Sequence, residues 1–130
     1  MAVTERHIAI VPPATHLAQT RLQPGQKWLA EYNVACWLRA RLVTAQTTIT
    51  LVLRYRDAAG EQQVAVDQAA CGKDGSVLLS AVATVPATGP VAEMSVSVLL
   101  SSPCEIAVDE LFVQRRGDTG AQAGRIITAG

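Results

Sequence analysis

The chain has 130 residues, of which 49% are hydrophobic and 17% charged, and its 11 basic and 11 acidic side chains give a net charge of zero. A chain of this length can bury one sizeable core, and its composition excludes a disordered protein. Zero net charge argues against general nucleic-acid binding, and no apolar stretch is long enough for a membrane span. The N-terminus, "MAVTERHIAIVPP", lacks the pattern of a secretory signal.

Turn-forming residues recur at nearly even spacing, and the segments between them alternate apolar and polar residues. This period of two, with abundant Val, Ile and Thr, predicts β-strands. The predicted strands are 6–11, 16–22, 28–42, 47–56, 62–69, 76–85, 93–100 and 104–114. Strands of this number and pattern predict an all-β protein, an antiparallel two-sheet jelly-roll β-sandwich.

The longest predicted strand, 28–42, has one apolar and one polar face. Its even positions, from Trp28 to Leu42, are apolar or amphipathic and are expected in the core. Its odd positions are mostly polar, and Trp37 stands among them beside Arg39. The alternation therefore places one tryptophan on the outer side of a sheet.

The later strands show the same alternation, with one interruption. In 47–56 the apolar residues from Ile49 to Tyr55 are expected inside, whereas the two faces of 76–85 are hard to tell apart. In 104–114 even positions are expected inside up to Val108, and odd positions from Leu111 onward. A slip of one residue near Asp109 predicts a β-bulge there.

The last residues differ in composition from the rest. We expect a β-sandwich domain over 1–116 and a flexible tail or docking arm over 117–130. The tail is small and polar until Ile126 and Ile127, which are the residues of an arm that would order on a neighbour. A frayed terminus is the alternative interpretation.

The outer side of the two longest alternating strands provides the candidate binding residues. If 28–42 and 47–56 form a hairpin, Trp37 lies opposite Val52 with arginines around it; if they enter opposite sheets, the patch is split. An indole flanked by guanidinium and amide donors suits a sugar ring or an acidic glycan, or a protein interface, unless another segment covers it. The candidate binding residues are Asn33, Trp37, Arg39, Arg41, Arg54 and Arg56.

Two stretches resemble a known family. The first is "QTRLQPGQKWLAEYNVACWLRA", with Gln19, Pro24, Gly25, Tyr32, Val34, Trp37 and Arg39 as its matching residues, and the second is "SVSVLLSSPCEIAVDELFVQRR". In their order and spacing they resemble carbohydrate-binding modules of the galactose-binding-like jelly-roll type, over about 17–116. The resemblance implies a jelly roll without catalytic machinery of its own. It also implies that Asp109 can help hold a structural calcium ion.

Catalytic and metal signals are weak elsewhere. The histidines, His7 and His16, have no catalytic pattern around them, and no carboxylate pair can be placed in a cleft. The three cysteines have no zinc-binding spacing; Cys36 is expected in the core, and a Cys71–Cys104 bridge is left open.

The sequence therefore predicts a non-catalytic binding module, not an enzyme, with no cofactor except calcium. We expect a structural or assembly subunit of a large particle, such as a phage capsid decoration or tail protein, that contacts itself or other proteins. The alternative is a carbohydrate-binding protein for a surface glycan or polysaccharide. The expected location is a virion, or outside the cell after release, and otherwise the cytoplasm; neither nucleic acid nor a membrane is an expected partner.

Overall fold

The computed structural model describes residues 4–11, 28–87, 91–118 and 126–127, and for 28–30, 87, 115–118 and 126–127 it describes the main chain alone. All regular elements in these ranges are strands. They are β1 (Thr4–Ile10), β2 (Trp28–Arg41), β3 (Thr47–Asp57), β4 (Gly60–Cys71), β5 (Gly75–Ala87), β6 (Glu93–Leu100), β7 (Glu105–Asp118) and β8 (Ile126–Ile127). The predicted strand 16–22 lies outside the described residues.

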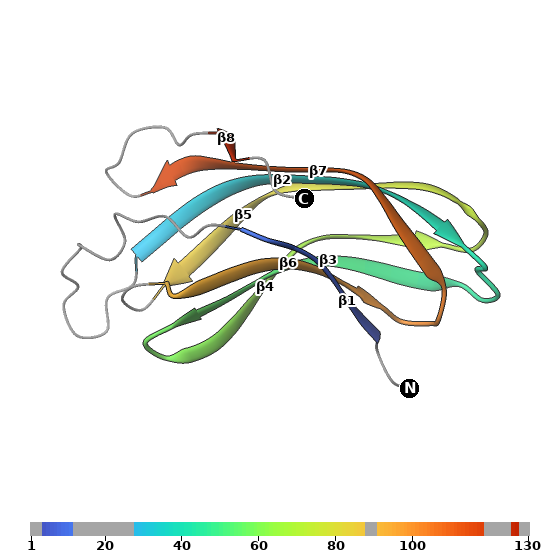
Figure 1. The fold of residues 1–130 in the computed structure, drawn as a ribbon, viewed down its shortest axis with the longest axis horizontal. Coiled ribbons are helices and arrows are strands. Elements are labelled where there is room, and N and C mark those ends of the chain that lie inside the picture. The colour runs from blue at the N-terminus through green and yellow to red at the C-terminus, as the bar shows by residue number, and fades with distance from the viewer. Residues whose placement is uncertain (1–3, 12–27, 88–90, 119–125, 128–130) are drawn as a thin grey trace.

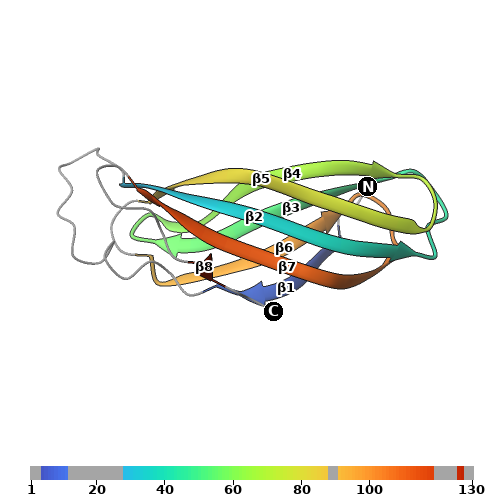
Figure 2. The same cartoon turned by 90° about the horizontal axis from the view of Figure 1, so that it is seen from above.

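The strands form two antiparallel sheets stacked face to face (Figures 1 and 2). Sheet A has the order β1-β6-β3-β4, and sheet B has the order β5-β2-β7-β8. The chain changes sheet at most connections, so the neighbours within a sheet are mostly distant in sequence, as in a jelly roll. The predicted class, an all-β antiparallel two-sheet sandwich, is confirmed.

The connection from β2 to β3 decides how the candidate residues are distributed. β2 pairs with β5 and β7, and β3 pairs with β4 and β6, so these two long strands lie in opposite sheets. The hairpin that would place Trp37 opposite Val52 is therefore wrong. The hairpin in this region is β3–β4, where the Asp57 side chain accepts the N–H of Ala59 and Gly60 adopts a φ of 109°.

The core lies between the sheets and follows the predicted alternation. The inward residues of β2, from Tyr32 to Ala40, and those of β3, from Ile49 to Tyr55, are buried. The same is true of alternate residues of β6, from Met94 to Leu100. Two residues depart from the prediction. Val108 is exposed beside the bulge on β7, where the regular pairing with β2 is interrupted. Leu42, expected in the core, is 60% exposed because β2 ends at Arg41 and Leu42 adopts a φ of 57°.

The predicted bulge is confirmed at Asp109. Trp37 pairs with Glu110 and the next residue, Leu38, pairs with Val108, so Asp109 is the extra residue of β7. The slip moves the inward positions from even to odd numbers and explains why Leu111 and Val113 are buried.

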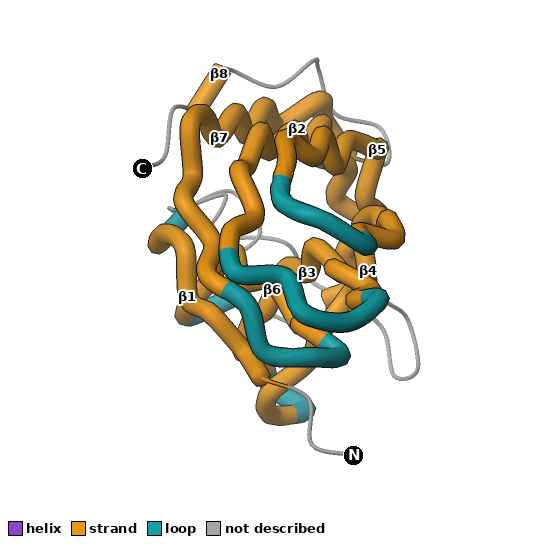
Figure 3. Tube along the Cα trace, turned by 90° about the vertical axis from the view of Figure 1, so that its right-hand side faces the viewer, coloured by secondary structure: helices purple, strands orange, loops and turns teal. Residues whose placement is uncertain are grey.

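Three connections gather at one end of the sandwich, 42–46, 72–74 and 101–104 (Figure 3). The Val43 N–H donates to Asp74 Oδ1 at 3.0 Å, and the Thr48 N–H donates to Ser101 Oγ at 2.8 Å. Along one side, Asp67 Oδ2 accepts the Ser80 N–H at 2.9 Å and so links β4 of sheet A to β5 of sheet B. The sandwich is thus tied at one end and along one edge.

Both sheets arch in the same direction (Figure 1). The outer face of sheet B is therefore convex and the outer face of sheet A is concave. We call these two surfaces the convex face and the concave face. They are the two places where the fold presents broad sets of side chains.

Candidate functional site

The convex face carries an exposed apolar patch that we define by Trp37, Leu78 and Val82. Trp37 on β2 pairs with Leu78 on β5, and Val82 lies four residues further along β5 on the same face. These three side chains are 45%, 44% and 47% exposed. Ala35 of β2 pairs with Phe112 of β7, in the row between Trp37 and Asn33. Both side chains are half-buried and continue the apolar surface across the sheet.

Polar groups border the apolar patch. The Arg39 Nε lies 3.1 Å from both carboxylate oxygens of Asp109, and its Nη2 is 3.0 Å from Asp109 Oδ1. On the other side, Asn33 Nδ2 donates to Gln114 Oε1 at 2.9 Å. An apolar centre with a polar rim is the usual arrangement of a protein interface.

The six predicted binding residues do not form one site. Four of them, Asn33, Trp37, Arg39 and Arg41, lie on β2 and belong to the convex face. Arg54 and Arg56 lie on β3 and belong to the concave face. The split arrangement is the one observed, because consecutive strands enter opposite sheets.

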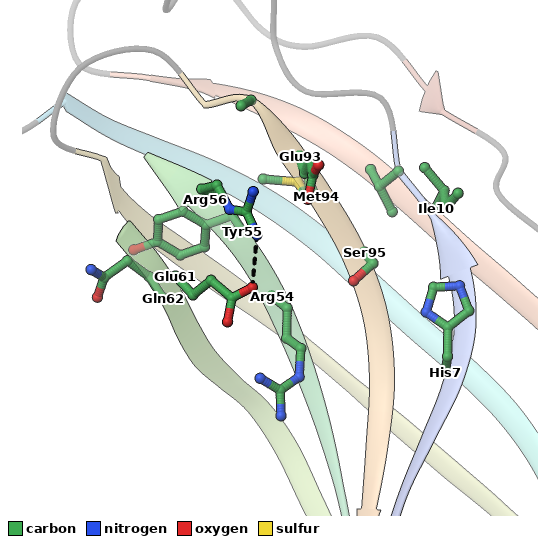
Figure 4. A pocket seen from close by; sticks show the side chains of 12 residues that line it. His7, Ile10, Arg54, Tyr55, Arg56, Glu61, Gln62, Glu93, Met94 and Ser95 are labelled. Carbon is green, nitrogen blue, oxygen red and sulfur yellow. Dashed lines mark hydrogen bonds and ion pairs between the residues drawn. The ribbon is translucent and has the colours of Figure 1, made fainter. Parts of the chain in front are cut away.

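The concave face contains a pocket of about 520 Å³ near the β3–β4 hairpin end of sheet A (Figure 4). All four strands of that sheet contribute to it. Its lining residues are His7, Ile10, Val11, Arg54, Tyr55, Arg56, Glu61, Gln62, Ala92, Glu93, Met94 and Ser95. In the pocket wall, Arg56 Nη2 donates to Glu61 Oε1, its pairing partner on β4, at 3.0 Å. Figure 4 shows this contact as a dashed line.

Charges fix the side chains around this pocket. The hydrogen bond that Arg56 donates to Glu61, followed by the charges of Glu93 and Glu61, raises the pKa of Arg56. Burial, followed by the charge of Asp57, raises the pKa of the Tyr55 phenol, whose hydroxyl donates to the Pro86 carbonyl at 3.1 Å. The Tyr55 ring is buried, so the pocket offers polar groups and Ile10 instead of an open aromatic platform.

An ion pair spans the concave face beside the pocket. Arg54 Nε donates to Glu5 Oε2 at 2.6 Å. Arg54 pairs with Ser95 of β6 and Glu5 pairs with Leu99, so the line between them crosses β6 at Ser97. Ser97 is 1% exposed and its partner Val52 is 0% exposed, although neither belongs to the core cluster between the sheets. Side chains of the concave face therefore bury a second, smaller layer outside the sandwich.

Asp109 does not fit the calcium site that the resemblance implies. Both of its carboxylate oxygens are held by the Arg39 guanidinium, and a calcium ion needs six to eight oxygen ligands. Within 4–11, 28–87, 91–118 and 126–127, no group of three or more His, Cys, Asp or Glu residues is placed to hold a metal. We therefore assign no role to calcium.

The tail residues are placed on the chain's own sheet. Ile126 pairs with Gln114 and Ile127 with Val113, so the main chain of β8 extends sheet B. β7 itself continues to Asp118, two residues past the predicted domain end at Arg116. A docking arm on a neighbour remains a prediction, and in the structure these two residues pair within the molecule.

All three cysteines are buried and carry free thiols, so the Cys71–Cys104 bridge left open above is not formed. Burial raises the pKa of the Cys36 thiol from its ordinary value of 9.0 to about 11. A thiol of that pKa is a poor nucleophile near neutral pH. Cys36 acts as a small core residue.

Sequence reasoning missed Leu78 and Val82 as surface residues. β5 has apolar residues on both faces, and alternation alone cannot tell which face is inside. The apolar residues on both faces of β5 were the available signal. A strand with one face toward water normally carries polar residues on that face, so apolar residues there indicate an exposed apolar surface. The pocket residues on β1 and β4 were missed because their contact depends on which strands are neighbours.

Comparisons of the chain with protein-family models, with curated proteins and with solved structures found no match. No helix in the described part of the chain is long and apolar enough to cross a membrane. The function is therefore inferred from the two outer faces.

Proposed function

We propose that the chain is a non-catalytic assembly module that binds a protein surface through the convex face, as a structural subunit of a larger particle such as a virion. The observation that carries this proposal is the exposure of the Trp37–Leu78 pair, and of Val82 two outward rows away, on the same face of one sheet. Exposed apolar surface that is bordered by polar residues is typical of interaction sites. Trp and Arg, which flank one another here, are enriched at the energetic centres of protein interfaces.

Sedimentation of the particle fraction from cells that make the protein tests this function. The unsubstituted chain should sediment with a large assembly. The double variant Trp37→Ser/Leu78→Ser should remain in the light fraction, since it removes apolar area from the patch without touching the core. Gln63→Ser, on the other sheet and outside the pocket, is the matched control and should sediment like the parent. A parent chain found only in the light fraction would exclude the assembly function.

A second candidate is carbohydrate binding at the concave pocket. The observation in its favour is the pocket of about 520 Å³ with Arg56, Gln62 and Ser95 in its lining. Such groups can bond sugar hydroxyls, and sites for small ligands are commonly concave with a few fixed polar groups.

A glycan array separates the two candidates. Retention of the parent that is lost in Gln62→Ala and kept in Trp37→Ala would support a sugar in the concave pocket. Loss in Trp37→Ala alone would move the sugar to the convex face. A parent retained on none of the glycans would remove the carbohydrate function.

A further inference from the structure

The outward residues of the convex face are arranged symmetrically about Ala35. Ala35 pairs with Ser80 on one side and Phe112 on the other, and we take this row as the centre. One row away in each direction β5 has an apolar residue, Val82 or Leu78. Two rows away in each direction β2 has a charge, Glu31 or Arg39, of opposite sign. Across the Ala35 row the apolar residues recur and the charges change sign. Two copies of this face can therefore pack apolar on apolar and acid on base.

We propose that the partner of the convex face is a second copy of this chain, packed face to face about a two-fold axis that crosses the strands at the Ala35 row. This inference rests on the proposed use of the convex face. Rotation about that axis places each β5 over the β5 of the second copy, and Leu78 over its Val82. It also places Trp37 over Asn33 of the second copy, and Arg39 over its Glu31.

The polar groups of β7 agree with the same axis. Glu110, which pairs with Trp37, comes over Gln114 of the second copy, so an amide N–H faces a carboxylate. Phe112 comes over Phe112 of the second copy, and aromatic rings at such a centre add apolar contact. Packed sheets cross at about 30°, and two convex faces also part away from the axis. The contact is therefore closest at the Ala35 row, and the long Arg39 side chain has to span the wider gap to Glu31 of the second copy.

The other in-plane axis is disfavoured by charge. A two-fold axis along β2 would place Arg39 over Arg39, Glu31 over Glu31 and Leu78 over Glu110. Like charges facing one another oppose association, and an apolar side chain over a carboxylate leaves the carboxylate without its water. The axis across the strands replaces every one of these contacts with a favourable one.

The size of the face sets the expected strength. Eight residue steps from Glu31 to Arg39 at about 3.3 Å each, and three strands at about 4.8 Å spacing, give a footprint of about 400 Å² per copy. Stable interfaces typically bury about 800 Å² per partner, so the dimer should be reversible and dependent on concentration. A two-fold contact is also closed, so a larger particle would be built from dimers through other surfaces, and both concave faces remain free for that.

Two charge reversals on separate chains test the arrangement. The Arg39→Glu chain should dimerise at least about tenfold more weakly than the parent, because two pairs of carboxylates would face each other. The Glu31→Arg chain should be weakened likewise, because two pairs of cations would face each other. When the two variants are mixed in equal amounts, each reversed residue faces an opposite charge, and a heterodimer should form with about the parent's affinity. Sedimentation velocity over a wide concentration range measures all four cases.

Controls keep the outcomes distinct. Lys73→Glu reverses a charge in the β4–β5 connection, away from both faces, and should dimerise like the parent. Thermal melting checks that Arg39→Glu, which also breaks the contact with Asp109, remains folded; Glu31→Arg leaves that contact intact. A monomeric parent, or a mixture no better than either variant alone, would overturn the dimer. A monomeric parent that still sediments with a particle through Trp37 would overturn the dimer and leave the proposed function standing.

Discussion

The two outer faces of the sandwich differ in how they treat the same kind of residue. Val52, on the concave face, is fully buried, whereas Val82, on the convex face, is nearly half exposed. Both are valines on the outer side of a strand. The difference is one of curvature and neighbours: side chains converge over a concave sheet and diverge over a convex one.

The polar contacts follow the same division. On the concave face the Glu5–Arg54 ion pair joins β1 to β3 across β6, over Ser97. On the convex face the Arg39–Asp109 pair joins neighbouring strands at the rim and leaves Trp37 open. An outer face of a sheet is therefore not always a solvent face. The apolar patch of the convex face is available for binding, whereas on the concave face Val52 is buried and stabilises the fold and Ile10 is exposed at the pocket.

The sharpest test of this comparison is the same substitution on both faces. Val52→Ala should lower the free energy of unfolding by about 2–3 kcal/mol, because it removes two buried methyl groups and leaves a cavity. Val82→Ala should change it by less than about 0.5 kcal/mol, because the side chain is already in contact with water. Urea unfolding of the two variants and the parent measures both values.

The measurement should be made at a concentration where the parent is monomeric, since a dimer through the convex face would add to the apparent effect of Val82→Ala. Leu53→Ala, in the core between the sheets, is the positive control and should cost about 2–5 kcal/mol. Equal effects at the two valines would show that the concave face is open in solution and would remove the distinction.

A second test asks whether water that reaches Trp37 on the convex face is kept out of the core behind it. Cys36 directly precedes Trp37 and points into the core, where burial raises the pKa of its thiol to about 11. The unfolded thiol ionises at its ordinary value of 9.0, so the folded state holds this proton more tightly. Its contribution to stability is complete below about pH 9 and is lost as the pH rises to about 11, a total of about 2 kcal/mol.

The comparison with Cys36→Ala isolates this effect from other groups that titrate at high pH. Urea unfolding of both proteins at a series of pH values should show their difference in stability narrowing by about 2 kcal/mol between pH 9 and 11. A difference that stays constant would mean that water reaches the thiol through the sheet.

Much of the fold could be predicted from the sequence because one face of each strand is buried. Alternation placed Tyr32 to Ala40 of β2 and Ile49 to Tyr55 of β3 on the correct sides, and the change of parity around Asp109 located a bulge. These are local signals, since a side chain's face is fixed by its position in its own strand. Leu42 was misplaced because β2 ends at Arg41, so the alternation no longer fixes its direction. Val108 was misplaced because it lies next to the bulge, where the pairing with β2 is irregular.

The site was predictable only in part, for a related reason. The outward position of Trp37 is local, and the structure leaves it exposed. The pairing of Trp37 with Leu78, and the meeting of His7 with Gln62 at one pocket, depend on strand order, which alternation does not encode. The choice between one patch and two faces could therefore be made only once the neighbours of β2 and β3 were known.

The smallest expected effect is the difference in coupling energy between the Glu5–Arg54 ion pair of the concave face and the Arg39–Asp109 ion pair of the convex face. Arg54 and Glu5 are 37% and 39% exposed, whereas Arg39 and Asp109 are 61% and 42% exposed. Double-mutant cycles with Glu5→Gln/Arg54→Met and with Asp109→Asn/Arg39→Met should give coupling energies of about 0.5–1 kcal/mol for the first pair and at most about 0.5 kcal/mol for the second. At 1 M salt, where the screening length is about 3 Å, the second coupling should vanish first, because its groups are closer to water. A larger coupling at the convex face would mean that its polar rim is the more ordered of the two surfaces, and the assignment of the concave face to stability would have to be reversed.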